Sequence, residues 1–139
     1  MYNVMKLDEI NKLCAHSLVG RLGIEFTSDY ADGLKARMPV NENTRQPHGY
    51  LHGGATIAFA ETIASVSSAC EVGGNVAAFG YHVDASLLLA VKDGYVYGSA
   101  TLAHQGRSSH IWDVTVVTDA SEIVALCRVT VKLVGAVQK

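Results

Sequence analysis

The chain has 139 residues, of which 49% are hydrophobic, and its formal net charge at pH 7 is -2. These values predict one globular domain over residues 1–139, with a core large enough to need no metal or disulfide. The slightly negative net charge argues against nucleic-acid binding. The chain also has no basic run and no interleaving of basic with aromatic residues.

The sequence predicts neither a signal peptide nor a membrane span. Charged residues interrupt the apolar ones near the N-terminus, and no window reaches the ~18 apolar residues that a span requires. The cysteines are far apart and form no CxxC pair, so free thiols are predicted at Cys14, Cys70 and Cys127. Free thiols indicate a reducing compartment, and we therefore expect a cytoplasmic protein with no membrane partner.

The first part of the chain predicts one short helix and two strands. Residues 7–13 show the apolar spacing of an amphipathic helix. Residues 19–27 alternate between apolar and polar side chains and predict a strand, which an Asp-Gly turn at 32–33 joins to a second strand over 34–38. A polar loop over 42–53 follows.

Residues 54–70 are predicted to form one long helix of small and apolar residues. A helix that is apolar on nearly all sides is normally buried on most of them. Its single acidic or basic residue is Glu61, and a buried lone carboxylate costs several kcal/mol unless it is paired, hydrated or used in chemistry. His52, Gly53 and Gly54 introduce the helix, and the free N–H groups of a helix start stabilise an anion. Glu61 is therefore a candidate functional carboxylate.

Beyond the helix the chain is predicted to consist of strands. Four strands separated by short polar connections are expected, over about 76–90, 94–104, 109–118 and 124–134. Short connections join antiparallel neighbours, so we predict a meander. Two strands, a long buried helix and four more strands indicate an α+β fold, in which the sheet curls around the helix.

The string QPxGxxHGGA over 46–55, followed by AET at 60–62, resembles the motif of the hotdog-fold acyl-CoA thioesterases. The resemblance covers nearly the whole chain. It is strongest to the group with the phenylacetate-pathway, 4-hydroxybenzoyl-CoA and 1,4-dihydroxy-2-naphthoyl-CoA thioesterases. It implies an antiparallel sheet around one central helix, a homodimer that often pairs into a homotetramer, and hydrolysis of an acyl-CoA thioester. Coenzyme A then belongs to the substrate, and no separate cofactor is expected.

The residues of this motif suit thioester hydrolysis. The developing oxyanion needs hydrogen-bond donors aimed at it in advance, and the Gly53 N–H and the Gln46 side-chain amide are candidates. Glu61 either attacks the carbonyl directly and forms an anhydride, or deprotonates a water, and the sequence fits both routes. Ser65, four residues later, either orients that water or carboxylate or bonds back to the helix backbone.

The histidines near the motif do not predict a metal site. His48 and His52 are four residues apart, but Gly49 and the turn-like segment around it argue against a shared helix, and no third ligand is evident. His52 is instead a candidate polar group near the thioester.

The spacing between donor and acid predicts a shared active site. Gly53 and Glu61 are eight residues apart, which is roughly 12 Å along a helix. One helix cannot easily bring both to one carbonyl carbon. If two such helices run antiparallel across a two-fold axis, the donor of one subunit meets the acid of the other. The family resemblance implies this arrangement, so the active form is expected to be at least a dimer.

Two further segments are candidate contacts for the substrate. Related thioesterases hold the pantetheine and phosphates of CoA near the turn at 105–108, where Arg107 and Ser108 suit a phosphate. Gly80, inside a strand, leaves room for a ligand to pass. The naphthoyl type carries His-x-Arg where this chain has apolar residues over 87–90, which removes a phosphate partner and suits an acyl or pantetheine channel. The candidate contacts are Gly54, Gly80, Leu87, Leu88, Leu89, Ala90, His104, Gly106, Arg107, Ser108 and Ser109.

Two rival functions fit the sequence less well. A hotdog dehydratase would need a catalytic histidine in a differently spaced motif, which is absent. A non-hydrolytic acyl-CoA-binding protein should lack Glu61 or carry a DNA-binding extension, and no extension is expected here. The motif does not specify the acyl group, which would contact residues outside it such as Tyr50, Phe59 and Ile63.

Overall fold

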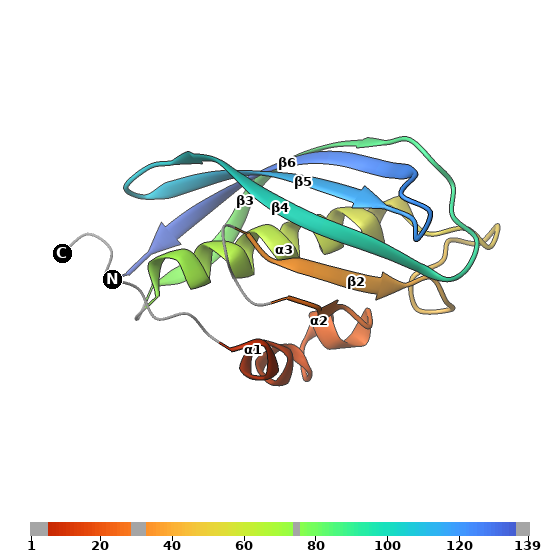
Figure 1. Cartoon of the computed structure of the whole chain (residues 1–139), viewed down its shortest axis with the longest axis horizontal. Helices are drawn as coiled ribbons and strands as arrows, with labels where there is room; N and C mark the ends of the chain where they lie inside the picture. The colour runs from red at the N-terminus through yellow and green to blue at the C-terminus, as the bar shows by residue number, and fades with distance from the viewer. Residues whose placement is uncertain (1–5, 29–32, 74–75, 136–139) are drawn as a thin grey trace.

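The computed structural model describes residues 6–28, 33–73 and 76–135. These residues form an antiparallel sheet that curls around one long helix (Figure 1). The elements in chain order are α1 Leu7–Cys14, α2 Leu18–Arg21, β1 Glu25–Phe26, β2 Lys35–Pro39, α3 Gly53–Val72, β3 Ala77–Leu87, β4 Tyr95–Gln105, β5 Ser109–Val117 and β6 Ile123–Val134. The predicted α+β class, the long helix and the short first helix are confirmed.

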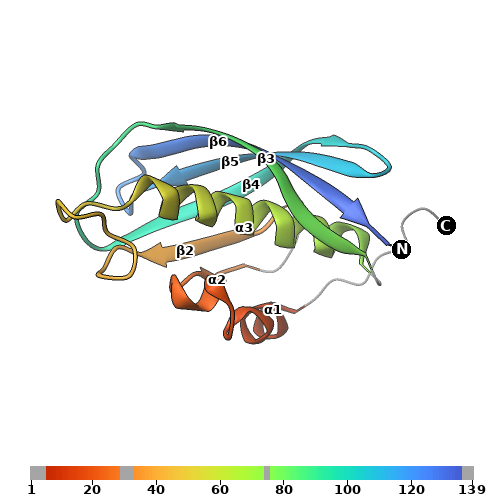
Figure 2. The same cartoon turned by 180° about the vertical axis from the view of Figure 1, so that it is seen from behind.

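The strand order is β1-β2-β4-β5-β6-β3, with every pairing antiparallel. The predicted meander is right for β4, β5 and β6 but wrong for β3, which pairs with β6 at the far edge of the sheet. The connection 88–94 is long enough to cross the ends of the intervening strands, and backbone bonds to its neighbours hold it there. As a result β3 lies against α3, and one of its edges has no partner strand among the described residues (Figure 2).

The predicted strand over 19–27 is largely wrong, because α2 occupies its first residues. The Ser17 side chain accepts from the Val19 N–H and caps this helix. Gly20 is required there, since a Cβ would overlap the backbone carbonyl of Ala15. Only Glu25–Phe26 remains as strand. The first residue of the predicted turn at 32–33 lies outside the described residues.

α3 buries one face and leaves the other half-exposed. Phe59 and Ile63 are fully buried against the sheet, which approaches closely because a Cβ on Gly98 would come within 2.5 Å of Ile63 Cδ1. Glu61 and Ser65 lie on the half-exposed face. The helix is therefore buried on fewer sides of the subunit than its composition predicts.

A polar cluster is buried near the end of α3. Ser68 Oγ lies 2.8 Å from Nδ1 of His110 and accepts from Trp112 Nε1 at 2.7 Å. His110 is 1% exposed, and its Nε2 is buried without a hydrogen-bond partner among the described residues. Burial lowers the pKa of this imidazole below its ordinary value, and the nearby His104 adds to the shift.

The three cysteines are free thiols, as predicted, and Cys70 and Cys127 are buried. Among the described residues, none of the helices combines the length and apolar character that crossing a bilayer requires.

Candidate active site

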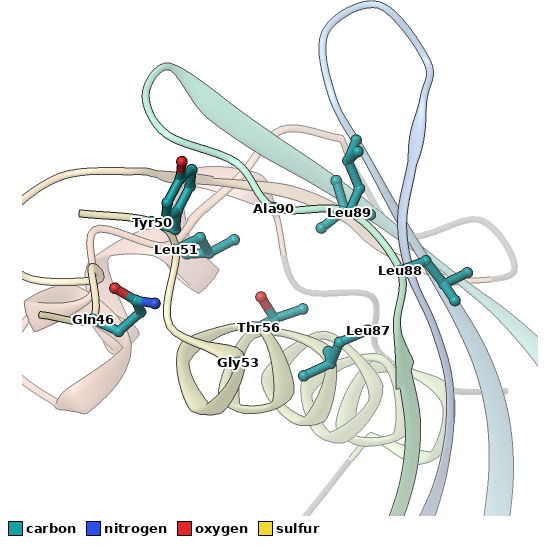
Figure 3. Close-up of a pocket in the computed structure, with 10 residues that line it drawn as sticks. Gln46, Tyr50, Leu51, Gly53, Thr56, Leu87, Leu88, Leu89 and Ala90 are labelled. Atoms are coloured by element: carbon teal, nitrogen blue, oxygen red, sulfur yellow. The ribbon is translucent and has the colours of Figure 1, made fainter. Parts of the chain in front are cut away.

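A pocket of about 310 Å³ opens between the start of α3, the loop before it and the segment that follows β3 (Figure 3). Gln46, Gly53 and Thr56 line its polar side. The four residues Leu87–Ala90 line the opposite side. The pocket thus brings together the two predicted oxyanion donors and the apolar segment that departs from the family pattern.

The first turn of α3 leaves one backbone donor free. The Gly54 N–H donates to Nδ1 of His52 at 2.7 Å, which makes the histidine the N-cap of the helix. The Ala55 and Thr56 N–H groups both donate to the His52 carbonyl. Within the described part of the chain, the Gly53 N–H has no acceptor. Because a helix start favours negative charge, this N–H is suited to an oxyanion.

The side chain of Gln46 is held with its amino group towards the pocket. The His48 N–H donates to Gln46 Oε1, and the loop closes further through the Gln46 N–H, which donates to the Tyr50 carbonyl at 2.7 Å. Gly49 turns the chain with φ +93°, a conformation that favours glycine. Since Oε1 is engaged, Nε2 remains as a second donor on the same side as Gly53 (Figure 3).

Glu61 lies on another part of the same helix and does not line this pocket. Its separation from Gly53 is eight residues, or roughly 12 Å of helix. Its carboxylate makes no hydrogen bond or ion pair with any described residue. Ser65 also makes none among the described residues, whereas Thr62 bonds back to the Ala58 carbonyl at 2.7 Å. One subunit therefore brings the donors together but not the acid.

Two predicted residues line a different pocket. His52 and Gly54, with Leu18, Leu22 and Ala58, belong to a mainly apolar pocket of about 310 Å³ on the α2 side of the helix start. The histidine is thus the capping residue of α3, and it lines this second pocket rather than the pocket of the two donors. Gly54 has its N–H engaged by that ring.

The predicted CoA contacts are split between the two ends of α3. The hairpin tip between β4 and β5 carries His104, Gly106, Arg107, Ser108 and Ser109. It lies beside the last turn of α3, where Gln105 Nε2 is 3.4 Å from Glu71 Oε2 (Figure 1). Glu71 is eighteen residues after Gly53, which is roughly 27 Å along the helix. Arg107 is therefore far from the pocket of its own subunit.

The space next to Gly80, predicted to admit a ligand, contains a protein side chain. A Cβ at this position would overlap the carboxylate of Glu61. Conversely, the pocket contains residues that sequence reasoning missed. Thr56 follows Gly53 by one helical turn and helical spacing indicates it, whereas Val124 on β6 carries no local signal. Among the described residues, no group of three His, Cys, Asp or Glu could hold a metal ion.

The family model described as the thioesterase superfamily matches residues 48–125, which include the helix start, Glu61 and β3 to β5. The chain belongs to the thioesterase superfamily. The proofreading thioesterase EntH of Cronobacter turicensis is 34% identical over 131 residues, covering 94% of this chain and 96% of that protein.

Solved structures agree with this membership. A thioesterase from Haemophilus influenzae superposes with a TM-score of 0.92 at 32% identity, covering 96% of this chain and 93% of that one. A glutamine-to-alanine variant of a Pseudomonas aeruginosa thioesterase gives a TM-score of 0.90 at 32% identity, covering 94% of each chain. The hotdog fold and the prediction of a thioester-hydrolysing enzyme are confirmed.

Proposed function

We propose that this thioesterase hydrolyses acyl-CoA thioesters, with an aromatic or medium-size acyl group, to the free acid and CoA. The observation that carries the proposal is the pair of free donors, the Gly53 N–H and Gln46 Nε2, on the polar side of a pocket whose opposite side is apolar. Such a pair suits the oxyanion that forms when a thioester carbonyl is attacked.

Glu61 supplies the base or the nucleophile in this proposal. As a base it removes a proton from water, the resulting hydroxide adds to the carbonyl, and the C–S bond then breaks. As a nucleophile it forms an anhydride that water later opens. In both routes the CoA thiolate leaves and takes up a proton. Ser65, on the same half-exposed helix face, would hold the water or the carboxylate.

The active unit is a homodimer in this proposal, because the donors and the acid are roughly 12 Å apart on one helix. Antiparallel pairing of two α3 helices brings the Glu61 of one subunit to the Gly53 of the other. The same pairing brings the hairpin tip of one subunit towards the pocket of its partner. The unpaired edge of β3, which carries the exposed Phe79 and Tyr81, is available for such pairing. Dimers would pair further into a homotetramer, in the cytoplasm.

The apolar wall of the pocket holds the acyl group or the pantetheine arm. Leu87, Leu88 and Leu89 are each 40–57% exposed in the subunit, which is unusual for three consecutive leucines in a strand end. Gly53 lies directly beneath this wall, since a Cβ there would come within 2.6 Å of Leu87 Cδ1. Apolar substrate atoms would therefore lie next to the oxyanion donors.

A panel of CoA thioesters tests the proposal. Benzoyl, phenylacetyl, hexanoyl and acetyl thioesters are mixed with the enzyme, and release of free thiol is followed. We expect the aromatic and medium-size substrates to have the highest kcat/KM and acetyl-CoA the lowest. The oxygen esters of the same acids serve as controls. No thiol release from any member of the panel would overturn the assignment.

A further inference from the structure

The strand that covers Glu61 has no side chain at the point of contact. Gly80 on β3 faces α3, and a Cβ built on it would lie 2.5 Å from Glu61 Cγ and 2.6 Å from Cδ, with Oε2 closer still. Real Cβ atoms do not approach other heavy atoms so closely. The Glu61 side chain therefore occupies the volume that any residue other than glycine would take.

A β-bulge follows immediately. Gly80 is opposite Val131 and His82 is opposite Thr130, so Tyr81 is the extra residue on β3. A bulge re-aims the side chains that follow it and commonly lies next to a functional site.

The bulge changes which residues of β3 face the helix. Before it, Ala78 and Gly80 face inwards, and after it Val83 and Ala85 pack against the core. Strict alternation from Gly80 would instead turn Asp84 inwards. The bulge thus keeps a second carboxylate on the exposed face, away from Glu61.

Packing, rather than a polar partner, holds Glu61 in place. The carboxylate has no hydrogen bond or ion pair among the described residues. Its lone pairs are consequently unengaged, as a base or nucleophile needs, while the β3 backbone limits where the side chain can lie.

We propose that Gly80 and the bulge at Tyr81 form a slot that positions the Glu61 carboxylate for the reaction, which makes Gly80 a positioning residue. This inference rests on the proposed function, in which Glu61 carries the chemistry. With alanine at position 80 the carboxylate must swing away, and misplacement of a reacting group by about 1 Å can cost about 100-fold in rate.

The test compares Gly80→Ala with Gly98→Ala. Both glycines are in strands, and both would direct an added Cβ at side chains of α3, but Gly98 faces Phe59 and Ile63. We expect Gly80→Ala to lower kcat by about tenfold or more with little change in KM. The acidic limb of its pH profile for kcat should also move. Gly98→Ala should lower the Tm but keep kcat within about threefold. Equal losses of kcat in the two variants would overturn the slot.

A double-mutant cycle that combines Gly80→Ala with Glu61→Gln separates this inference from the proposed function. If Gly80 acts through the carboxylate, Gly80→Ala should change the residual rate of Glu61→Gln by less than about twofold. A loss as large as in the wild-type background would overturn the slot. If Glu61→Gln by itself keeps wild-type activity, the proposed function fails, whatever Gly80→Ala does.

Folding of the variant provides a second measurement. Glu61→Ala removes Cγ, Cδ and Oε2, the three atoms that an added Cβ at position 80 would overlap. The double variant Gly80→Ala/Glu61→Ala should therefore have a higher Tm and soluble yield than Gly80→Ala alone. Equal or lower stability of the double variant would overturn the slot even if Gly80→Ala folds poorly.

Discussion

The two ends of the proposed machinery lie on one helix but are built differently. The donor end is local: Gln46 is held by residues two and four positions away, and the His52 ring caps a residue two positions away. The acid end is not local, because Glu61 packs against Gly80, nineteen residues later on another element. A short segment can therefore preorganise the oxyanion donors, whereas the acid depends on how β3 packs on α3.

The largest expected effect is at the acid end. Glu61→Gln keeps the shape but removes the base and nucleophile, so kcat should fall by about 10²–10⁴ with little change in KM. Glu71→Gln on the last turn of the same helix is the matched control and should leave kcat unchanged. If Glu61→Gln retains more than about a tenth of the wild-type kcat, Glu61 is neither the base nor the nucleophile of the reaction.

Removing a donor should have a somewhat smaller effect. Gln46→Ala deletes one of the two proposed oxyanion donors, and loss of one such donor typically costs about 10²-fold in kcat. The hydrogen bonds of Gln46 join only residues of the same loop. Loss of its side chain should therefore leave the unfolding temperature close to the wild-type value. Steady-state kinetics with a thermal melt check both points. A large fall in Tm would mean that Gln46 stabilises the fold rather than acting as an oxyanion donor.

Mixing the two inactive variants sharpens the comparison between the ends. When Glu61→Gln and Gln46→Ala subunits exchange, half of the dimers become hybrids, and each hybrid has one site with both residues intact. Activity should then recover to about a quarter of the wild-type value, since a two-fold dimer has two equivalent sites. Demonstrated exchange without recovery would mean that each subunit builds its own site.

The hairpin tip should contribute only to binding. If Arg107 binds a CoA phosphate as proposed, Arg107→Ala removes a charge-assisted contact that acts equally on ground and transition states. The KM for acyl-CoA should rise several-fold, with kcat nearly unchanged. An acyl-pantetheine, which lacks the nucleotide phosphates, should show no effect. An identical response of both substrates would make Arg107 a solvated turn residue.

The smallest effect concerns stability rather than catalysis. Burial lowers the pKa of His110 in the native protein and so disfavours its protonated form. In the unfolded chain this imidazole takes up a proton as the pH falls through about 6.5. Its contribution to the free energy of unfolding is therefore fully present above that pH and is lost as the pH falls below it. Between pH 7 and 5 the Tm should fall by roughly 2–5 °C. His110→Gln should reduce this dependence, and the exposed His16→Gln should not.

Local patterns predicted most of the fold. The small apolar residues of α3 and the alternation along β4, β5 and β6 were sufficient for those elements, because helix period and tight turns involve residues close in sequence. The same patterns failed at α2, where Gly20 and a serine cap favour a helical turn over the predicted strand. They also failed for β3, because nothing within a strand specifies a partner that lies at the other edge of the sheet.

The candidate site divides in the same way. The sequence by itself predicted the candidate donors at Gln46 and Gly53 and the candidate acid at Glu61, since a spaced motif and a lone carboxylate on an apolar helix can be recognised locally. Only the tertiary structure decided that Gly80 makes room for this acid, that Leu87–Ala90 line the donor pocket, and that Arg107 lies at the opposite end of α3. The reason is physical: these contacts form only when β3, the connection 88–94 and the β4–β5 hairpin pack around α3, and they join segments far apart in the chain.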